Sequence, residues 1–269
     1  MFRGFPITEL LSKAGRQQLR ELHKRKKCKP TTTPWGFKFF GPEFLFSGHF
    51  QAEETQLIRK LLEDTDVLVN VGAHVGYYCC HALQMGKRVI AVEPNLDNAH
   101  YLLRNIQING WSDRAEVFIA AVGSGPDILE MWGSGTASSL IQGWAGNGPL
   151  SAFVPVLSLD RIASEAIAGV RTLFIVDVEG YEFFALQGAA RCLRSTPRPT
   201  WMVEITAMRH RPSGQPTNPY LKDTFAFFFN NGYVCTTAKE KPEQIDQPRV
   251  EAAATGLPLK ENNYLFQHS

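Results

Sequence analysis

A glycine turn and an acidic residue are spaced in this sequence as an adenosine site requires. Gly72 and Gly76 lie in a G-x-x-x-G pattern directly after an apolar run at 66–71, and Glu93 ends the next apolar run. Gly72 permits a tight turn with close backbone approach, and we expect Gly76 to let the following helix pack against the strand. An acid at position 93 can accept both ribose hydroxyls. A purely structural glycine turn is the alternative interpretation.

The missing glycines favour S-adenosylmethionine over a dinucleotide. A dinucleotide turn would need glycine at the positions that hold Asn70 and Val75, and fewer glycines suit the backbone less well to cradling a pyrophosphate. S-adenosylmethionine has no phosphate to cradle. The residues predicted to bind it follow three successive strands: Asn70, Gly72, Ala73, His74, Gly76, Glu93, Pro94, Asn95, Ala121, Val122 and Asp177.

Acidic residues follow two further predicted strands. Methyl transfer leaves the protein two tasks, the positioning of the acceptor and the removal of its proton. We expect Asp177 to orient the acceptor and Glu179 to act as the base; alternatively, both only cap the next helix. Glu204, at the end of the next strand, could assist them or join them in a site of hard oxygen ligands. We nevertheless predict no metal.

Alternating strands and helices are predicted to position these residues. The pattern indicates a mostly parallel, seven-stranded α/β sheet with helices on both faces. We expect strands at 66–71, 88–92, 115–122, 154–156, 172–176, 201–205, 233–237 and 263–267. We expect helices at 53–63, 76–85, 95–109, 182–193 and 220–230, and one beginning near Arg161 with Asp160 as its cap.

The N-terminal segment 1–50 is predicted to differ from the methyltransferase-like domain at 51–269. Residues 1–30 hold nine lysines and arginines, so this arm could contact nucleic acid or an anionic membrane. The alternative is a solvated amphipathic helix over 7–27. Residues 31–50 indicate a hairpin or flap, and 123–150 a glycine-rich loop. We expect the flap and the loop residues 133–148 to close over the substrate.

Composition narrows the class of protein. No apolar run approaches the roughly 18 residues that a membrane span needs. The five cysteines are scattered, without the spacing of zinc ligands. They indicate a reducing compartment, and we predict a cytoplasmic protein. Nothing in the sequence indicates an oligomeric state.

Seven short blocks resemble the FkbM family of methyltransferases, in order, from about residue 36 to the closing NNYLF. They are DVLVNVGAHVGYY, VIAVEPN, LLRNIQING, AVGS, VLSLDRI, FIVDVEGYE and VEI. The resemblance implies a class I methyltransferase fold, S-adenosylmethionine, and O-methylation of hydroxyls on sugars or natural products. Two positions depart from it: Asn70 replaces an aspartate, and Ile175 replaces a lysine that is common in the family.

The predicted function is therefore O-methylation of a small-molecule or glycan hydroxyl. The first alternative is a methyltransferase that acts on nucleic acid or another macromolecule through the basic arm. The second is a non-catalytic binding protein with the same fold, suggested by Asn70 and Ile175. A nicotinamide dehydrogenase is a more distant third.

Overall fold

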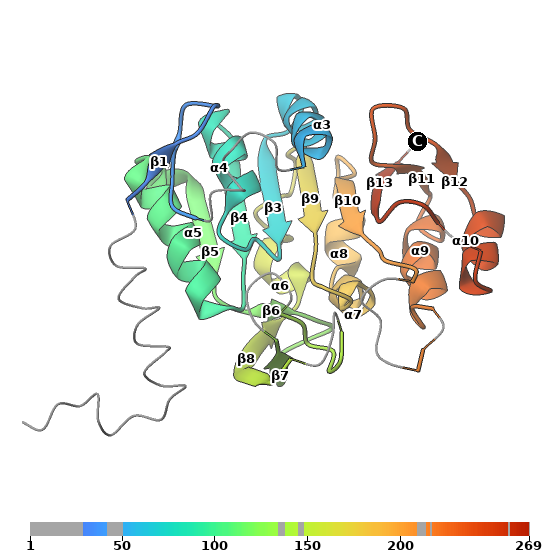
Figure 1. Ribbon diagram of the computed structural model, residues 1–269. Coiled ribbons are helices and arrows are strands. Elements are labelled where there is room, and N and C mark those ends of the chain that lie inside the picture. Colours follow the sequence, from blue (N-terminus) through green and yellow to red (C-terminus); the bar gives the residue numbers. More distant parts are fainter. Residues whose placement is uncertain are drawn as a thin grey trace, which may run out of the picture.

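The computed structural model describes residues 29–41, 51–133, 138–144, 148–208, 214–215, 217–257 and 259–268. It is an α/β structure in which a twisted central sheet carries helices on both faces (Figure 1). This arrangement confirms the expected class I methyltransferase fold. The basic arm, apart from Lys29 and Pro30, lies outside the described residues, so its predicted helix and partners stay predictions.

The central sheet has the strand order β12-β11-β13-β10-β9-β3-β4-β5. Strands β5, β4, β3, β9, β10 and β11 run in one direction, while β13 and β12 run in the other. The bounds are β3 Val67–Val71, β4 Arg88–Val92, β5 Ala115–Phe118, β9 Thr172–Val176, β10 Thr200–Glu204, β11 Tyr233–Thr237, β12 Gln244–Ile245 and β13 Asn263–His268. The prediction of seven strands was one short within the described residues. The extra strand, β12, is a two-residue edge pairing without an apolar alternation to announce it.

Strand side chains alternate between the two faces, as the pleat requires. On one face Leu68 and Leu173 pack under α3, α4 and α5; on the other Val69 and Phe174 pack under α6 to α10. The helices are α3 Ala52–Glu63, α4 Tyr77–Gln84, α5 Leu96–Ile108, α6 Leu159–Ala163, α7 Glu182–Gln187, α8 Ala190–Leu193, α9 Leu221–Phe229 and α10 Gln247–Ala254. Within the part of the chain that the structure describes, no helix has the length and apolar character needed to cross a bilayer.

The predicted strand at 115–122 is divided between two sheets. The chain leaves the central sheet after β5 and continues as β6, which pairs with β8 in a separate sheet of order β6-β8-β7. The short strand expected at 154–156 is the end of the longer β8. The bounds are β6 Ala121–Val122, β7 Asp127–Trp132 and β8 Leu150–Leu157.

The helix predicted at 182–193 is two helices, because the chain at Gly188 comes close to the backbone of Gly123. A Cβ on Gly188 would lie 2.0 Å from the Gly123 carbonyl oxygen. The predicted cap was also wrong. Ser158 caps α6, whereas the Asp160 carboxylate accepts hydrogen bonds from the backbone N–H groups of Arg191 and Cys192 in α8.

The described part of the flap does not cover the substrate site. The hairpin of β1 (Thr31–Thr32) and β2 (Lys38–Phe39) packs on the outer side of α4 and α5 (Figure 1). Phe37 and Phe39 are buried there against α4 residues, and Asn105 of α5 donates to the Phe40 carbonyl. Aromatic burial therefore holds this hairpin away from the strand ends. Residues 42–50 of the flap lie outside the described residues.

Candidate active site

A cavity of about 400 Å³ opens at the carboxyl ends of β3, β4, β9 and β10. Chain order reverses at this edge: β4 and β5 follow β3 on one side, and β9 lies on the other. Ligands of open α/β sheets bind at such a switch point. The cavity lies where the sequence places the glycine turn and the acidic residues.

The glycine turn after β3 brings two strands into close backbone contact. Gly72 has φ +81°, and a Cβ on it would lie 1.7 Å from the Asp177 carbonyl oxygen. The N–H groups of Gly72 and Ala73 both donate to the Val92 carbonyl, at 2.9 and 3.0 Å. The predicted need for glycine at position 72 is thus met by the approach of the chain at Asp177.

Gly76 serves a different contact from the one predicted. Its φ is +86°, and a Cβ there would lie 2.4 Å from Cδ1 of Leu102 in α5. The glycine therefore lets the start of α4 pack against a neighbouring helix, rather than against the preceding strand. Among the described lining residues of the cavity, Gly76 does not appear.

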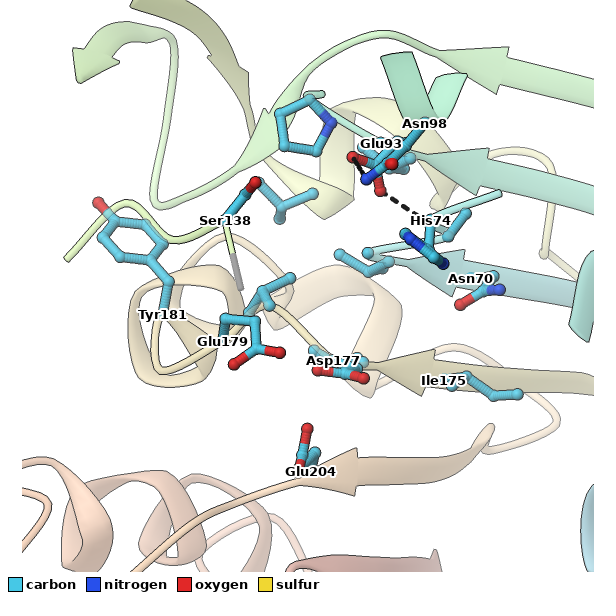
Figure 2. Close-up of a pocket in the computed structure, with 18 of the residues that line it drawn as sticks. Asn70, His74, Glu93, Asn98, Ser138, Ile175, Asp177, Glu179, Tyr181 and Glu204 are labelled. Atoms are coloured by element: carbon cyan, nitrogen blue, oxygen red, sulfur yellow. Dashed lines mark hydrogen bonds between the residues drawn. The ribbon is translucent and has the colours of Figure 1, made fainter. Parts of the chain in front are cut away.

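Glu93 is buried at the end of β4 with its carboxylate directed at the glycine turn (Figure 2). Its Oε2 accepts the backbone N–H of His74 at 2.8 Å. Its Oε1 accepts the N–H of Asn95 at 2.9 Å and Nδ2 of Asn98 at 3.3 Å. Burial raises the pKa of Glu93, and the hydrogen bonds from Asn95 and His74 oppose that rise. The carboxylate is thus fixed at the wall of the cavity.

The other predicted cofactor residues line the cavity, with Asn95 as the second exception. Asn95 accepts hydrogen bonds from the N–H groups of Asp97 and Asn98 and so caps α5, as predicted. Asn70 is buried, and its Nδ2 donates to Sγ of Cys79 at 3.4 Å. The predicted lining residues are Asn70, Gly72, Ala73, His74, Glu93, Pro94, Ala121, Val122 and Asp177.

Three carboxylates gather at the opposite end of the cavity. Oxygen atoms of Asp177, Glu179 and Glu204 all lie within 4.8 Å of one another, and Figure 2 shows the three side chains facing one space. That spacing would also suit a divalent cation. Glu182 takes the capping role considered for its neighbours, because its Oε1 accepts the Gly180 N–H at 2.9 Å.

Crowding of these acids changes their protonation. Burial and the charge of Asp177 raise the pKa of Glu179 to about 7, while a hydrogen bond from Trp144 opposes the rise. Burial, followed by the charge of Asp177 and a hydrogen bond with it, raises the pKa of Glu204 strongly. The group therefore holds at least one proton near neutral pH, and Glu179 titrates in the physiological range.

The glycine-rich loop covers one side of this acidic group. Ser139 is buried, and its hydroxyl donates to the Glu179 carbonyl at 2.7 Å. Trp144 packs against Gly180, where a Cβ would lie 2.4 Å from the indole. Glu179 itself has φ 51°, a conformation that costs energy for a residue with a side chain. The described loop residues 138–144 thus contribute to the site, as expected for this loop.

Sequence reasoning missed a polar group on the far wall of the cavity. Glu54 accepts the Tyr78 hydroxyl at 2.5 Å through Oε1 and Nδ2 of Asn263 at 2.7 Å through Oε2. All three residues line the cavity. In the sequence Glu54 belongs to the polar face of an amphipathic helix, and Asn263 opens the last strand. No local pattern distinguishes either of them from ordinary surface residues.

The model of the "Methyltransferase FkbM domain" family matches residues 70–235, more than half of the chain. This span includes the glycine turn, Glu93 and the three gathered carboxylates. A search of the curated proteins found no match.

Several solved structures are similar in fold. A precorrin-6y C5,15-methyltransferase from Geobacter metallireducens is 11% identical, with a TM-score of 0.44 over 86% of this chain and 94% of that one. An O-methyltransferase from Bacillus cereus in complex with S-adenosylhomocysteine is 11% identical, with a TM-score of 0.44 over 80% and 79%. Fibrillarin from Aeropyrum pernix with bound S-adenosylmethionine is 11% identical, with a TM-score of 0.39 over 76% and 67%. At these values they carry no information on the acceptor.

Proposed function

Because the chain belongs to the FkbM family of S-adenosylmethionine-dependent methyltransferases, we propose that it methylates a hydroxyl group of a small molecule, sugar or natural product. The observation that carries the proposal is the cavity between two acidic walls. One wall presents Glu93 beside the glycine turn, and the other presents the three carboxylates. An adenosyl group and an acceptor thereby find separate ends of one site.

The residues at the glycine turn fit S-adenosylmethionine. Gly72 leaves room that a side chain would fill, and the fixed carboxylate of Glu93 is placed to accept the ribose hydroxyls. Ala121 and Val122 supply an apolar edge for the adenine. We assign the roles in cofactor binding to the predicted residues that line the cavity. Asn95 acts through Glu93, and Gly76 through helix packing.

Glu179 is the proposed general base. When bound, S-adenosylmethionine supplies an electrophilic methyl group on a positively charged sulfur. The acceptor oxygen attacks the methyl carbon, the carbon–sulfur bond breaks with its electron pair left on sulfur, and the hydroxyl proton passes to Glu179. A carboxylate with a pKa of about 7 is partly ionised at neutral pH and holds a proton well enough to accept one in the transition state. Asp177 is proposed to orient the acceptor.

Calorimetry with S-adenosylhomocysteine tests the cofactor site, and transfer of a labelled methyl group to a library of hydroxylated compounds tests the reaction. We expect micromolar-range binding and a product whose new methyl group is on oxygen. Absence of binding would contradict the cofactor assignment, and a methyl group found on nitrogen or carbon would contradict the O-methylation.

The macromolecular alternative depends on the basic arm, most of which lies outside the described residues. The acidic cavity argues against a phosphate-rich acceptor, since five of its lining residues are carboxylates. Removal of residues 1–29 is therefore expected to leave the activity intact. An activity that this deletion abolishes, and that falls steeply with salt, would favour nucleic acid. The four described cysteines are free and buried, which supports the expected reducing, cytoplasmic location.

A further inference from the structure

The acceptor end of the cavity is built from acids on separate elements. We use this term for the wall formed by Glu54, Tyr78, Asp177, Glu179, Glu204 and Asn263. Glu54 lies on α3, Asp177 and Glu179 follow β9, and Glu204 ends β10. Residues more than a hundred positions apart thus direct four carboxylates at one space.

No lysine or arginine is found among the described residues that line this cavity. The one lining residue that can carry a positive charge is His74, and burial lowers its pKa, which favours the neutral ring. Ile175, at the base of the cavity, is apolar and buried. S-adenosylmethionine carries a net single positive charge, so the bound cofactor offsets only part of the negative charge.

Hydrogen bonds fix the carboxylate of Glu54 in this wall. The Tyr78 hydroxyl lies within hydrogen-bonding distance of both Glu54 Oε1 and Gln51 Oε1, at 2.5 and 2.8 Å. Asn263 holds the second carboxylate oxygen. Each oxygen has a further lone pair with which to accept an N–H donor. An acid held in place in this way recognises a ligand at lower entropic cost than a mobile surface acid does.

We propose that the acceptor is a hydroxylated amine, whose ammonium group is held by Glu54 and Glu204 while its hydroxyl faces Glu179. The inference rests on the proposed function and names the substrate class of the same site. An ammonium group donates three N–H bonds and neutralises the crowded carboxylates. A phosphate or carboxylate in the same position would be repelled by every charged residue of the described wall. Amino sugars and phenolic amines have the required chemistry.

Matched triplets of probes test this inference on the full chain saturated with S-adenosylhomocysteine. One triplet is glucosamine, glucose and glucuronate; the other is tyramine, 4-ethylphenol and 4-hydroxyphenylacetate. Affinities are measured by ligand-observed NMR and calorimetry, at low and high salt and with EDTA. We expect the amine of at least one triplet to bind at least tenfold more tightly than its neutral partner, with the acid weakest. High salt should reduce the difference.

Three variants link the preference to the wall. Glu54→Gln and Glu204→Gln are expected to lower amine affinity about tenfold and to leave the affinity of the neutral partner unchanged. Ile175→Lys is expected to abolish the preference by placing an ammonium group inside the cavity. Glu116→Gln, which removes an exposed carboxylate of β5, is the matched control and should change neither affinity. Thermal unfolding of each variant verifies the fold.

Several results would overturn the inference: binding of no amine, equal binding of the neutral partner, or a preference that survives both glutamine variants. Loss of the preference in EDTA with recovery in Mg²⁺ would assign the wall to a metal ion instead. Arg209 and Arg211 lie outside the described residues, so a preference for the acid that disappears in the R209A/R211A variant would also overturn it. Binding of S-adenosylhomocysteine is measured first, and its absence would contradict the proposed function rather than the substrate class.

Discussion

The backbone N–H of His74 donates to Oε2 of Glu93 at 2.8 Å, which joins the turn after β3 to the acid that ends β4. Two residues of neighbouring parallel strands thereby form one wall of the cavity (Figure 2). The contact uses one lone pair of the carboxylate and fixes its orientation. The same carboxylate is then available to a ribose placed beside the turn.

Replacement of Glu93 should weaken cofactor binding. Hydrogen bonds to a charged group contribute about 1.5–3 kcal/mol, so we expect Glu93→Gln and Glu93→Ala to lower the affinity for S-adenosylhomocysteine about tenfold or more. Calorimetry measures the loss, and Glu116→Gln serves as the control. Because Glu93 also satisfies three donors of the protein, unfolding curves must accompany the titrations. Unchanged affinity in a folded Glu93→Ala protein would refute the ribose contact.

Gly72→Ala should damage both stability and cofactor binding. The new Cβ would lie 1.7 Å from the Asp177 carbonyl oxygen, so the turn must move. Gly110→Ala is the matched control, because Gly110 has a similar φ of +71° but no atom within 4 Å of the added Cβ. The control should cost about 1–2 kcal/mol for its left-handed conformation, with affinity retained. Urea unfolding that gave equal losses for the two variants would exclude a role for the close approach.

Glu179→Gln should slow the reaction without weakening the cofactor complex. Removal of a general base typically costs about 10²–10⁴-fold in rate, and the glutamine retains the shape of the side chain. Single-turnover rates and S-adenosylhomocysteine titrations separate the two effects. If Glu179→Gln and Asp177→Asn both turned over at the normal rate, the proton would have to leave by another route.

Turnover should rise with pH through about 7. The base must be ionised, and the pKa of Glu179 is raised from 4.5 to about 7 by burial and by the charge of Asp177. The active fraction is therefore small at pH 5.5 and near its maximum at pH 8.5. A kcat profile measured on the wild type and on Glu179→Gln tests this, since the residual activity of the variant should lack the step. A wild-type rate independent of pH between 5.5 and 8.5 would contradict the assignment.

The free energy of unfolding should fall as the pH rises from about 5 to about 8. The pKa of Glu182 is raised from 4.5 to about 8, mainly by burial, so the folded protein retains a proton that the unfolded chain releases. Stability from such a group is complete below the unfolded pKa and is lost toward the folded pKa. Chemical unfolding at several pH values should show a shallower slope in Glu182→Gln, which keeps the acceptor for Gly180. An identical slope would mean that Glu182 is ionised in the folded state.

Local sequence patterns predicted the parts of the site that follow strands directly. Gly72, Glu93 and Asp177 were found from an apolar run and the residue type after it, because a buried parallel strand has both signals within a few positions. Local patterns were less successful where the chain changes direction. The division of 115–122 between two sheets, the helix break at Gly188 and the position of the hairpin at 31–39 all depend on distant contacts.

The sequence by itself determined the alternation of strands and helices, the cofactor edge and the family, because periodicity, turn residues and motif spacing are local properties of the chain. Only the tertiary structure decided that Glu54 of α3 faces Glu204 of β10 across one cavity, and that Glu182 rather than Glu179 binds the turn. These relations depend on how α3 packs on the sheet and how the chain leaves β9. Packing of this kind joins residues that have no pattern in common along the sequence.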